Sequence, residues 1–486
     1  MIRLTRSTSF FVLGIGLAGL SASLAGCGAD PGDRPEDEPM GEAASPITVN
    51  PGSSLFVNEP AVLKRFSLRR VLQQIIDRTP GIAPLTPQAL YAQMFDTLND
   101  AGHAQTSGPH CTGTINGFGA ECPRTEGILA ATNPFDGRFV DSYSPAAIVN
   151  RFDLAPTSGS NCGEYRIVYG KQLSGELSEL DRLLVIFEGR LPNPTPELGL
   201  EGCLPVAQMW VSLGGLDSTA RAAALESFFF AGLTAGAVTF EPVVDPTHYG
   251  MAEDFSAGGP SRGQIRTNMF MAGRPYFDGL NHVGDWQLRE FRTRRVWDDG
   301  VRSLQIRNVA VANNPDPSLF RPNPAPGSRA ETFQTVDFLA MVPRLAKPGV
   351  GSTDAALIGM RTKAIYNSGA SDANSSQDYL LRAAGNAPFK SAITAKLAAI
   401  GRSDLTADDI LRRATSQSCG GCHQVSRQAP NGLMGGGIIF PHTIQGFTHI
   451  NEDGGPSEAM VEVFLPHRAA VLEAFVNAPA TAVQAA

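Results

Sequence analysis

The sequence lacks any excess of positive charge. Its 39 Lys and Arg residues are outnumbered by 47 Asp and Glu residues, which gives a formal net charge of −8. We therefore expect no nucleic-acid partner, because binding to phosphates needs a basic surface. The apolar run from Phe10 to Leu20 is also shorter than the roughly 20 residues that a membrane-spanning helix needs. No internal repeat is visible, and 486 residues can bury a sizeable core without help from disulfides.

The first residues have the layout of a secretory signal, with Arg3 and Arg6 before the apolar run and small residues after it. The run is followed by the segment LAGC at residues 24–27, which resembles the lipobox of bacterial lipoproteins. This resemblance implies that residues 1–26 are removed and that Cys27 becomes an acylated N-terminus. A plain secretory leader with an unrelated cysteine is the alternative.

The residues that begin at Cys27 predict a tether to a membrane. Residues 27–54 are rich in Pro, Gly, Asp and Glu, and this composition is typical of a disordered acidic segment. Gly28 stands where lipoproteins retained at the inner membrane carry aspartate, so the same resemblance favours the outer membrane. Removal of the leader subtracts two arginines and changes the net charge from −8 to −10. We expect an exported protein held by its lipid, facing the periplasm or the cell surface.

Cysteine usage predicts two disulfides. The seven cysteines are Cys27, Cys111, Cys122, Cys162, Cys203, Cys419 and Cys422. If Cys27 carries lipid and the last two carry a cofactor, four remain in a compartment where disulfides persist, and they permit three pairings. The most local pairing joins Cys111 to Cys122 and closes short loops at the smallest entropic cost. It also joins Cys162 to Cys203. The alternative for these four is a zinc site completed by His103 and His110.

One motif predicts specific cofactor chemistry. Residues 419–423 have the sequence CGGCH, the CxxCH pattern of c-type haem attachment. Two thiols one helical turn apart reach the two vinyl groups along one porphyrin edge, and the adjacent histidine presents a nitrogen to iron. With 7 Cys and 8 His in 486 residues, chance gives about 0.002 occurrences. The C-terminal region thus resembles a cytochrome c, which implies covalent haem at Cys419 and Cys422 with His423 as an axial iron ligand.

Two other chemistries use a CxxC pair. A thioredoxin-like redox pair would sit in a βαβ unit with the first cysteine at a helix N-terminus, whereas this motif follows a predicted helix. A structural zinc site would need a second CxxC or a close histidine pair, for which His442 and His449 are a loose match. Both alternatives stay open at this point.

The segments around the motif fit a cytochrome c domain. Thr406 and Asp409 form a capping box in its shorter form, which predicts a helix from 407 to about 417. We expect Arg412 and Arg413 to point outward from it. After the motif, residues 432–437 are rich in glycine, which either lets the backbone approach a flat cofactor or simply makes turns. Two further helical segments are predicted, at residues 456–463 and 466–475.

The sixth iron ligand is left open by the sequence. The candidates are Met434, His442, His449, Met460 and His467. We favour His449, because it lies in an apolar context at a chain distance that allows it to return over the ring. Met434 and Met460 are the next candidates. Each of these side chains has an alternative role in ordinary core packing or on the surface.

The central region mixes helices and strands, and its connections contain many Pro and Gly residues. Apolar spacing predicts helices at residues 60–78, 88–99, 219–230 and 330–345. Alternation predicts strands at residues 165–169, 183–187, 264–271, 286–294 and 304–311. An α+β domain with long loops is the expected class. Gly259 to Gly263 matches GxSxG, but the match precedes a predicted strand, which is the reverse of a nucleophile elbow.

Together these features predict a lipoprotein of two parts: an α+β domain at 55–385 whose role the sequence does not reveal, and a small, mainly α-helical, cytochrome c-like domain at 388–478. We expect a membrane-anchored one-electron carrier that exchanges electrons with a redox partner protein or a small-molecule donor or acceptor. The alternatives are a haem enzyme of peroxidase or oxidase type with an open sixth position, and a haem-based binding or sensor lipoprotein. The single motif favours the carrier over the enzyme.

Overall fold

The computed structural model describes residues 47–96, 113–120, 125–135, 143–171, 183–250, 262–271, 285–298, 300–427, 430–443, 447–451 and 453–478. The predicted leader, Cys27, Cys111 and Cys122 lie outside these residues, and so does the serine of the GxSxG match. Within the described ranges, none of the helices combines the length and the apolar character that crossing a membrane requires.

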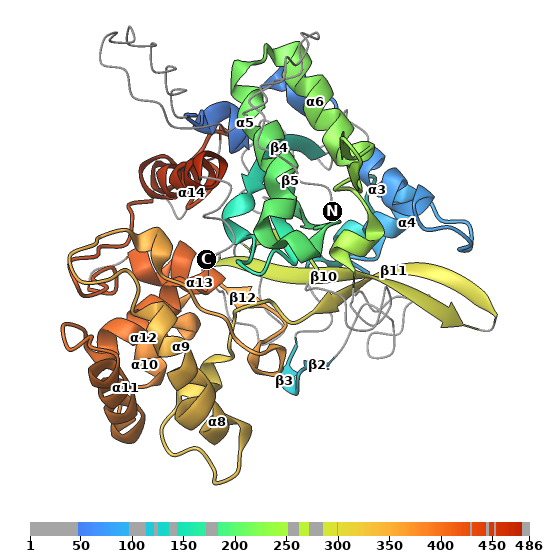
Figure 1. Cartoon of the computed structure of the whole chain (residues 1–486). Coiled ribbons are helices and arrows are strands. Elements are labelled where there is room, and N and C mark those ends of the chain that lie inside the picture. The colour runs from blue at the N-terminus through green and yellow to red at the C-terminus, as the bar shows by residue number, and fades with distance from the viewer. Residues whose placement is uncertain are drawn as a thin grey trace, which may run out of the picture.

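An antiparallel sheet, eight-stranded in the described residues, forms the centre of the molecule (Figure 1). The strands follow the order β1-β4-β5-β6-β9-β10-β11, and β12 pairs with β10. Their bounds are β1 Phe56–Val57, β4 Tyr143–Arg151, β5 Asn161–Lys171, β6 Leu183–Pro192, β9 Gln264–Met271, β10 Asp285–Asp298, β11 Val301–Val309 and β12 Ser371–Asp372. Helices pack beside the sheet, so the fold is α+β, as the sequence predicted.

Alternation of side chains along the strands gives the sheet two different faces. In β5, Tyr165, Ile167 and Tyr169 are fully buried on one face, while Glu164 and Arg166 lie on the other. All five predicted strands overlap strands of this sheet. The sequence analysis missed most of β4, because a register shift between Pro145 and Ala147 interrupts its alternation.

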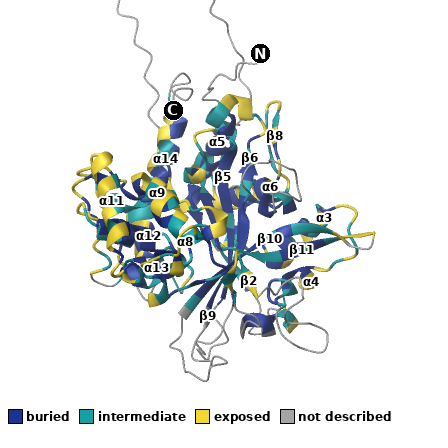
Figure 2. Ribbon diagram, turned by 90° about the horizontal axis from the view of Figure 1, so that it is seen from below, coloured by how far each residue is buried: buried dark blue, intermediate teal, exposed yellow. Residues whose placement is uncertain are grey.

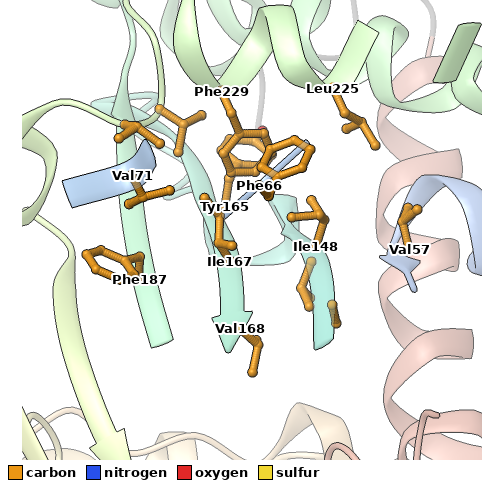
Figure 3. Packing of buried hydrophobic residues seen from close by; sticks show 14 of the residues in the cluster. Val57, Phe66, Val71, Ile148, Tyr165, Ile167, Val168, Phe187, Leu225 and Phe229 are labelled. Carbon is orange, nitrogen blue, oxygen red and sulfur yellow. The ribbon is translucent and has the colours of Figure 1, made fainter. Parts of the chain in front are cut away.

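The first face is covered by α3 Leu68–Asp77, α5 Leu204–Ser212 and α6 Ser218–Phe230. Figure 3 shows Phe229 and Leu225 of α6 directed at Phe66, Tyr165 and Ile167. Asp217 starts α6 by accepting hydrogen bonds from the first backbone amides of the helix, and the predicted helix at 219–230 is confirmed. This face is therefore an ordinary aromatic and aliphatic core.

The predicted bridge between Cys162 and Cys203 is present, with an S–S distance of 2.03 Å. It ties β5 to the residue that precedes α5. Both sulfur atoms are buried at the edge of the apolar core. The bridge therefore fixes a covering helix to the central sheet.

A second, separate core lies among the helices that follow the sheet (Figure 2). It extends from Leu319 to Phe440 and includes α8 Arg329–Thr332, α9 Phe338–Leu345, α10 Tyr379–Arg382, α11 Ala387–Ala399 and α12 Ala407–Ser416. The predicted helix at 330–345 is thus two α-helices joined by a π-helical turn at Phe333–Asp337. The capping box of Thr406 and Asp409 at the start of α12 is confirmed.

The last helix belongs to the first core and not to the second. A π-helical turn at Met460–Phe464 continues directly into α14 Leu465–Asn477. The predicted break before Pro466 is wrong, because proline is tolerated in the first turn of a helix. Leu472 and Phe475 pack with the sheet core.

The segment 47–54, which the sequence analysis placed in the disordered tether, is folded against α14. The backbone of Ile47 exchanges two hydrogen bonds with the Asn477 side chain, and the Val49 amide donates to Glu473 at 2.7 Å. A short helix, α1 Pro51–Ser54, follows, and its last two residues are buried. The predicted tether thus ends by residue 47.

The remaining elements are short. Their bounds are α2 Pro60–Leu63, α4 Pro87–Ala92, α13 Cys419–His423, β2 Thr114–Ile115, β3 Phe118–Gly119, β7 Leu233–Ala235 and β8 Val238–Phe240. The predicted helix at 60–78 is divided into α2 and α3, because Ser67 caps α3 by accepting from the Arg70 amide. The predicted helix at 88–99 corresponds to α4, which ends earlier.

Candidate metal and cofactor site

The CxxCH motif forms its own short helix, α13, directly after α12. Ser418 caps it by accepting a hydrogen bond from the Gly421 amide at 3.0 Å, and donates in turn to the Thr415 carbonyl at 2.8 Å. The Cys422 amide donates to the Ser418 carbonyl at 2.9 Å. The cap therefore sets the direction of α13 relative to α12 and fixes the two thiols one turn apart.

The two glycines between the cysteines are required by packing. A Cβ atom added to Gly420 would lie 2.0 Å from the Asp372 carbonyl oxygen, and one added to Gly421 would lie 1.8 Å from the Thr415 carbonyl oxygen. Both neighbours are backbone atoms, which cannot move aside as the end of a side chain can. The helix is therefore pressed against the end of α12 on one side and against β12 on the other.

Strand β12 connects this helix to the sheet. Ser371 Oγ accepts a hydrogen bond from the Gly420 amide at 3.2 Å. Gln287 of β10 donates to the Asp372 carboxylate at 2.7 Å, and β12 pairs with β10 through Ser371 and Leu288. The motif is thus attached to the central sheet through two successive residues of β12.

A compact loop brings His449 to the motif. Ser457 Oγ donates to the Thr448 carbonyl at 2.6 Å, and the Ser457 amide donates to the His449 carbonyl at 3.1 Å. Thr448 Oγ1 lies 3.5 Å from the Cys422 carbonyl oxygen. Ligand atoms of Cys422, His423 and His449 all lie within 4.8 Å of one another, and the two imidazole rings are 5.9 Å apart by their centroids.

The donor chemistry of these residues fits a metal centre. The Nδ1 atom of His449 is buried and has no hydrogen-bond partner among the described residues, so it is available to a ligand. Burial, together with the positive charges of His423 and nearby arginines, lowers the pKa of His449 well below its usual value. The imidazole is therefore neutral at neutral pH, which is the form that binds metals.

The two thiols do not have the properties of a redox pair. Cys419 and Cys422 are not bonded to each other. Burial raises the pKa of Cys419 to about 12 and that of Cys422 to about 11. A reactive CxxC cysteine has a lowered pKa, so a thioredoxin-like exchange is disfavoured.

Distances in the group suit two kinds of centre. A first-row metal binds imidazole at about 2 Å, so two nitrogens on opposite sides of one ion are roughly 4 Å apart. That separation lies within the 4.8 Å limit of the group. Tetrahedral ligands lie closer together still. His423 and His449 could therefore hold the iron of a haem, and with Cys422 they could hold a zinc ion.

The other sequence candidates for an iron ligand lie elsewhere. Met434 is buried in the second core, and Met460 is buried in the first, where its sulfur accepts from Arg468 at 3.4 Å. His442 is 74% exposed and contacts Glu458 at 2.6 Å, and His467 contacts Asp354 at 2.8 Å. Of the candidate histidines, His449 is the one grouped with His423.

The structure corrects the expected orientation of one neighbouring residue and describes the conformation of the glycine-rich stretch. Arg413 does not point outward: it is fully buried, and it donates to the backbone carbonyls of Met434, Leu345, Lys347 and Gly435. The apolar periodicity of α12 could not reveal these partners, because they come from distant loops. The glycine-rich stretch is a series of turns, since residues 435–437 all have positive φ.

The candidate site lies against the second face of the central sheet, which is lined by charged residues. We call this the charged face, and its members are Arg151, Glu164, Arg166, Glu188, Arg190, Arg266, Glu290 and Arg292. The three glutamates are at most 1% exposed, and each contacts two arginines, at least one of which belongs to a neighbouring strand. For example, Glu188 contacts Arg166 and Arg266, each at 3.2 Å.

The sequence analysis assigned no role to these charged residues. In the sequence, the charged face corresponds to pairs of charges two residues apart and one single charge on the strand between the last two pairs: Glu164 and Arg166, Glu188 and Arg190, Glu290 and Arg292, and Arg266. It becomes visible only when the strands are paired.

Comparison of the chain with protein-family models, with curated proteins and with solved structures gave no match.

Proposed function

We propose that this protein is a membrane-anchored c-type cytochrome that carries one covalently attached haem and transfers single electrons. The observation that carries the proposal is the grouping of the CxxCH motif with His449, a distant histidine whose buried Nδ1 atom has no other partner in the described residues. Cys419 and Cys422 would attach the porphyrin, and His423 and His449 would bind its iron. The haem supplies the one-electron exchange.

Residues of the chain would position the two thiols and the two histidines. The Ser418 cap and the close contacts of Gly420 and Gly421 would hold both attachment points in place. Thr448 and Ser457 hold the His449 loop against the motif. Two histidine ligands leave no open position for substrate, which favours a carrier over a peroxidase or oxidase. The predicted lipid at Cys27 would keep the carrier at a membrane.

Absorption spectroscopy tests this proposal. The chain, expressed together with haem-ligation machinery, should give a low-spin spectrum in both oxidation states, and carbon monoxide should leave the reduced spectrum unchanged. The His449→Ala variant should become high-spin and bind carbon monoxide, while His442→Ala should behave as the wild type, because His442 is exposed at another site. A high-spin wild-type spectrum would favour the enzyme alternative, and a colourless protein would rule out both haem functions.

A structural zinc site is the second candidate, and the same group of atoms favours it. Cys422, His423 and His449 are ligand types that zinc prefers, and their atoms are close enough to share one ion. Colourless protein that retains one zinc per chain after dialysis, and loses it in the His449→Ala variant, would support this candidate. Pigmented protein without zinc would exclude it.

A further inference from the structure

Among the described residues, Arg468 of α14 is a buried cation without a hydrogen-bonded carboxylate. Its side chain is 5% exposed, and the carboxylate oxygen paired with it, on Asp153, lies 4.0 Å from its Nε atom, which is longer than a hydrogen bond. Its one hydrogen bond to the described residues is a weak one, to the sulfur of Met460 at 3.4 Å. Burial of an ion without a close counter-ion is costly, so this arrangement calls for an explanation.

The carboxylates near Arg468 are already engaged. Asp153 accepts hydrogen bonds from Arg151 at 2.8 and 2.9 Å. Glu164 contacts Arg166 at 2.6 Å. Burial and repulsion from Arg151 lower the pKa of Arg468 well below its usual value, which means that its surroundings hold too little negative charge. The described residues thus provide more positive than negative charge at this point.

This surplus charge lies next to the candidate metal site. The Arg468 guanidinium is 5.9 Å from the centre of the Phe464 ring, and the same ring is 5.9 Å from the His449 ring. Arg468, Arg166 and Arg151 are also among the groups whose charge acts on His449. The side chains of Arg151 and Arg166 are 16% and 18% exposed, so the position is not sealed from solvent.

The backbone also has an unusual conformation beside Arg468, a π-helical turn. Phe464 ends the π-helical turn that begins at Met460, and the Leu465 amide donates to the Met460 carbonyl across this wider turn. Phe464 and Arg468 are four residues apart and therefore lie on one side of the helix. Such π-turns are rare and occur frequently at functional sites.

We propose that Arg468, with Arg151 and Arg166 beside it, forms an anion-binding site next to His449 that takes a carboxylate. A planar guanidinium pairs with a carboxylate through two parallel hydrogen bonds, and this pairing would supply the charge that the described residues do not. The carboxylate has two possible sources: a side chain of the porphyrin itself, or a small free organic acid. The anion site does not depend on haem being bound.

Thermal unfolding of the full chain, purified from a host without haem-ligation machinery, tests the site. Acetate replaces chloride at constant ionic strength. The unfolding temperature should rise and then saturate for the wild type. Arg468→Gln should weaken the apparent affinity for acetate by about 10- to 100-fold, because it removes a charge-assisted hydrogen bond. Arg69→Gln is the matched control: Arg69 is an exposed arginine that also lies over a phenylalanine ring, and its loss should leave the response intact.

The source of the carboxylate is then found with the haem-loaded chain. Loss of the acetate response on haem attachment identifies the porphyrin, and a retained response identifies a free acid. An acetate response that is unsaturable and equal in the wild type and Arg468→Gln would overturn the proposal. If Arg468→Gln does not fold, Arg468→Lys keeps the charge but loses the planar pairing, and it should weaken the affinity for acetate without abolishing it; an unchanged affinity would count against the site. A chain that never takes up haem would contradict the proposed function but would leave this titration valid.

Discussion

The two faces of the central sheet differ in how they are stabilised. On the face toward α6, Tyr165 stacks on Trp210 with 5.5 Å between ring centroids, and Phe229 and Leu225 complete a packed core (Figure 3). On the charged face, buried glutamates lie between arginines, and the CxxCH helix and His449 lie against them. The apolar face holds the fold together. The charged face is harder to explain by stability alone, because buried ion pairs contribute little net free energy.

The largest effects on the free energy of unfolding should come from substitutions that disrupt the packing or ion pairs of a single face of the sheet. Phe229→Ala should lower the free energy of unfolding by about 3–5 kcal/mol through lost burial and a cavity. Glu188→Gln should cost less, about 1–3 kcal/mol, because Arg166 and Arg266 lose their shared carboxylate but each keeps a second carboxylate partner. Only Glu188→Gln should also shift the spectrum or the metal content of the site. Urea unfolding measures the loss of stability, and absorption spectroscopy of the folded variants measures the change at the site. If both variants changed the spectrum or the metal content equally, the charged face would not be more closely linked to the site than the apolar face.

The disulfide tests the apolar face further. Cys162 and Cys203 are 41 residues apart, and a loop of that length predicts a contribution of about 4 kcal/mol to the free energy of unfolding. The Cys162→Ala, Cys203→Ala double variant should lose that amount and keep the spectrum of the site. A change in the spectrum would show that the bridge also supports the site.

Acid should weaken the charged face selectively. Burial would raise the pKa of Glu164, but Arg166 and its neighbours lower it to about 2, and Asp153 is lowered to about 2 in the same way by Arg151. Both carboxylates therefore contribute stability that is complete above their unfolded pKa values of 4.5 and 3.8 and is lost as the pH falls toward 2.

The wild type should accordingly lose more stability between pH 5 and pH 3 than Glu164→Gln does, relative to each protein at pH 5. Phe229→Ala provides the comparison, since it retains every charged residue and should follow the wild-type pH dependence. Urea unfolding at the two pH values measures the difference. Parallel pH profiles for the wild type and Glu164→Gln would show that Glu164 does not supply this stability.

The smallest effect is expected away from both faces. His442→Ala should change the free energy of unfolding by no more than about 0.5 kcal/mol, because the side chain is 74% exposed. Its spectrum should match the wild type. A spectral change in His442→Ala with none in His449→Ala would mean that His442, and not His449, reaches the metal.

The sequence predicted local features well and long-range ones poorly. The helix at 219–230, the strand at 264–271 and the capping box at Thr406 depend on short-range patterns, and the structure contains all three. The CxxCH motif is equally local. The Cys162–Cys203 bridge was also predicted, because it belongs to the most local of the three possible pairings.

The rest depends on contacts between distant residues. Arg413 was expected at the surface, because its carbonyl partners lie in two loops that its own helix does not reveal. The break predicted at Pro466 ignored the first-turn position that proline tolerates. The charged face combines strands from residues 143 to 298, so no local pattern contains it.

The most direct test of the central claim is the mass of the proteolytic peptide that contains residues 419–423. After expression with haem-ligation machinery, that peptide should carry one haem through two thioether bonds and stay coloured through acid-acetone extraction. An unmodified peptide with two free thiols, from protein made under the same conditions, would contradict the account.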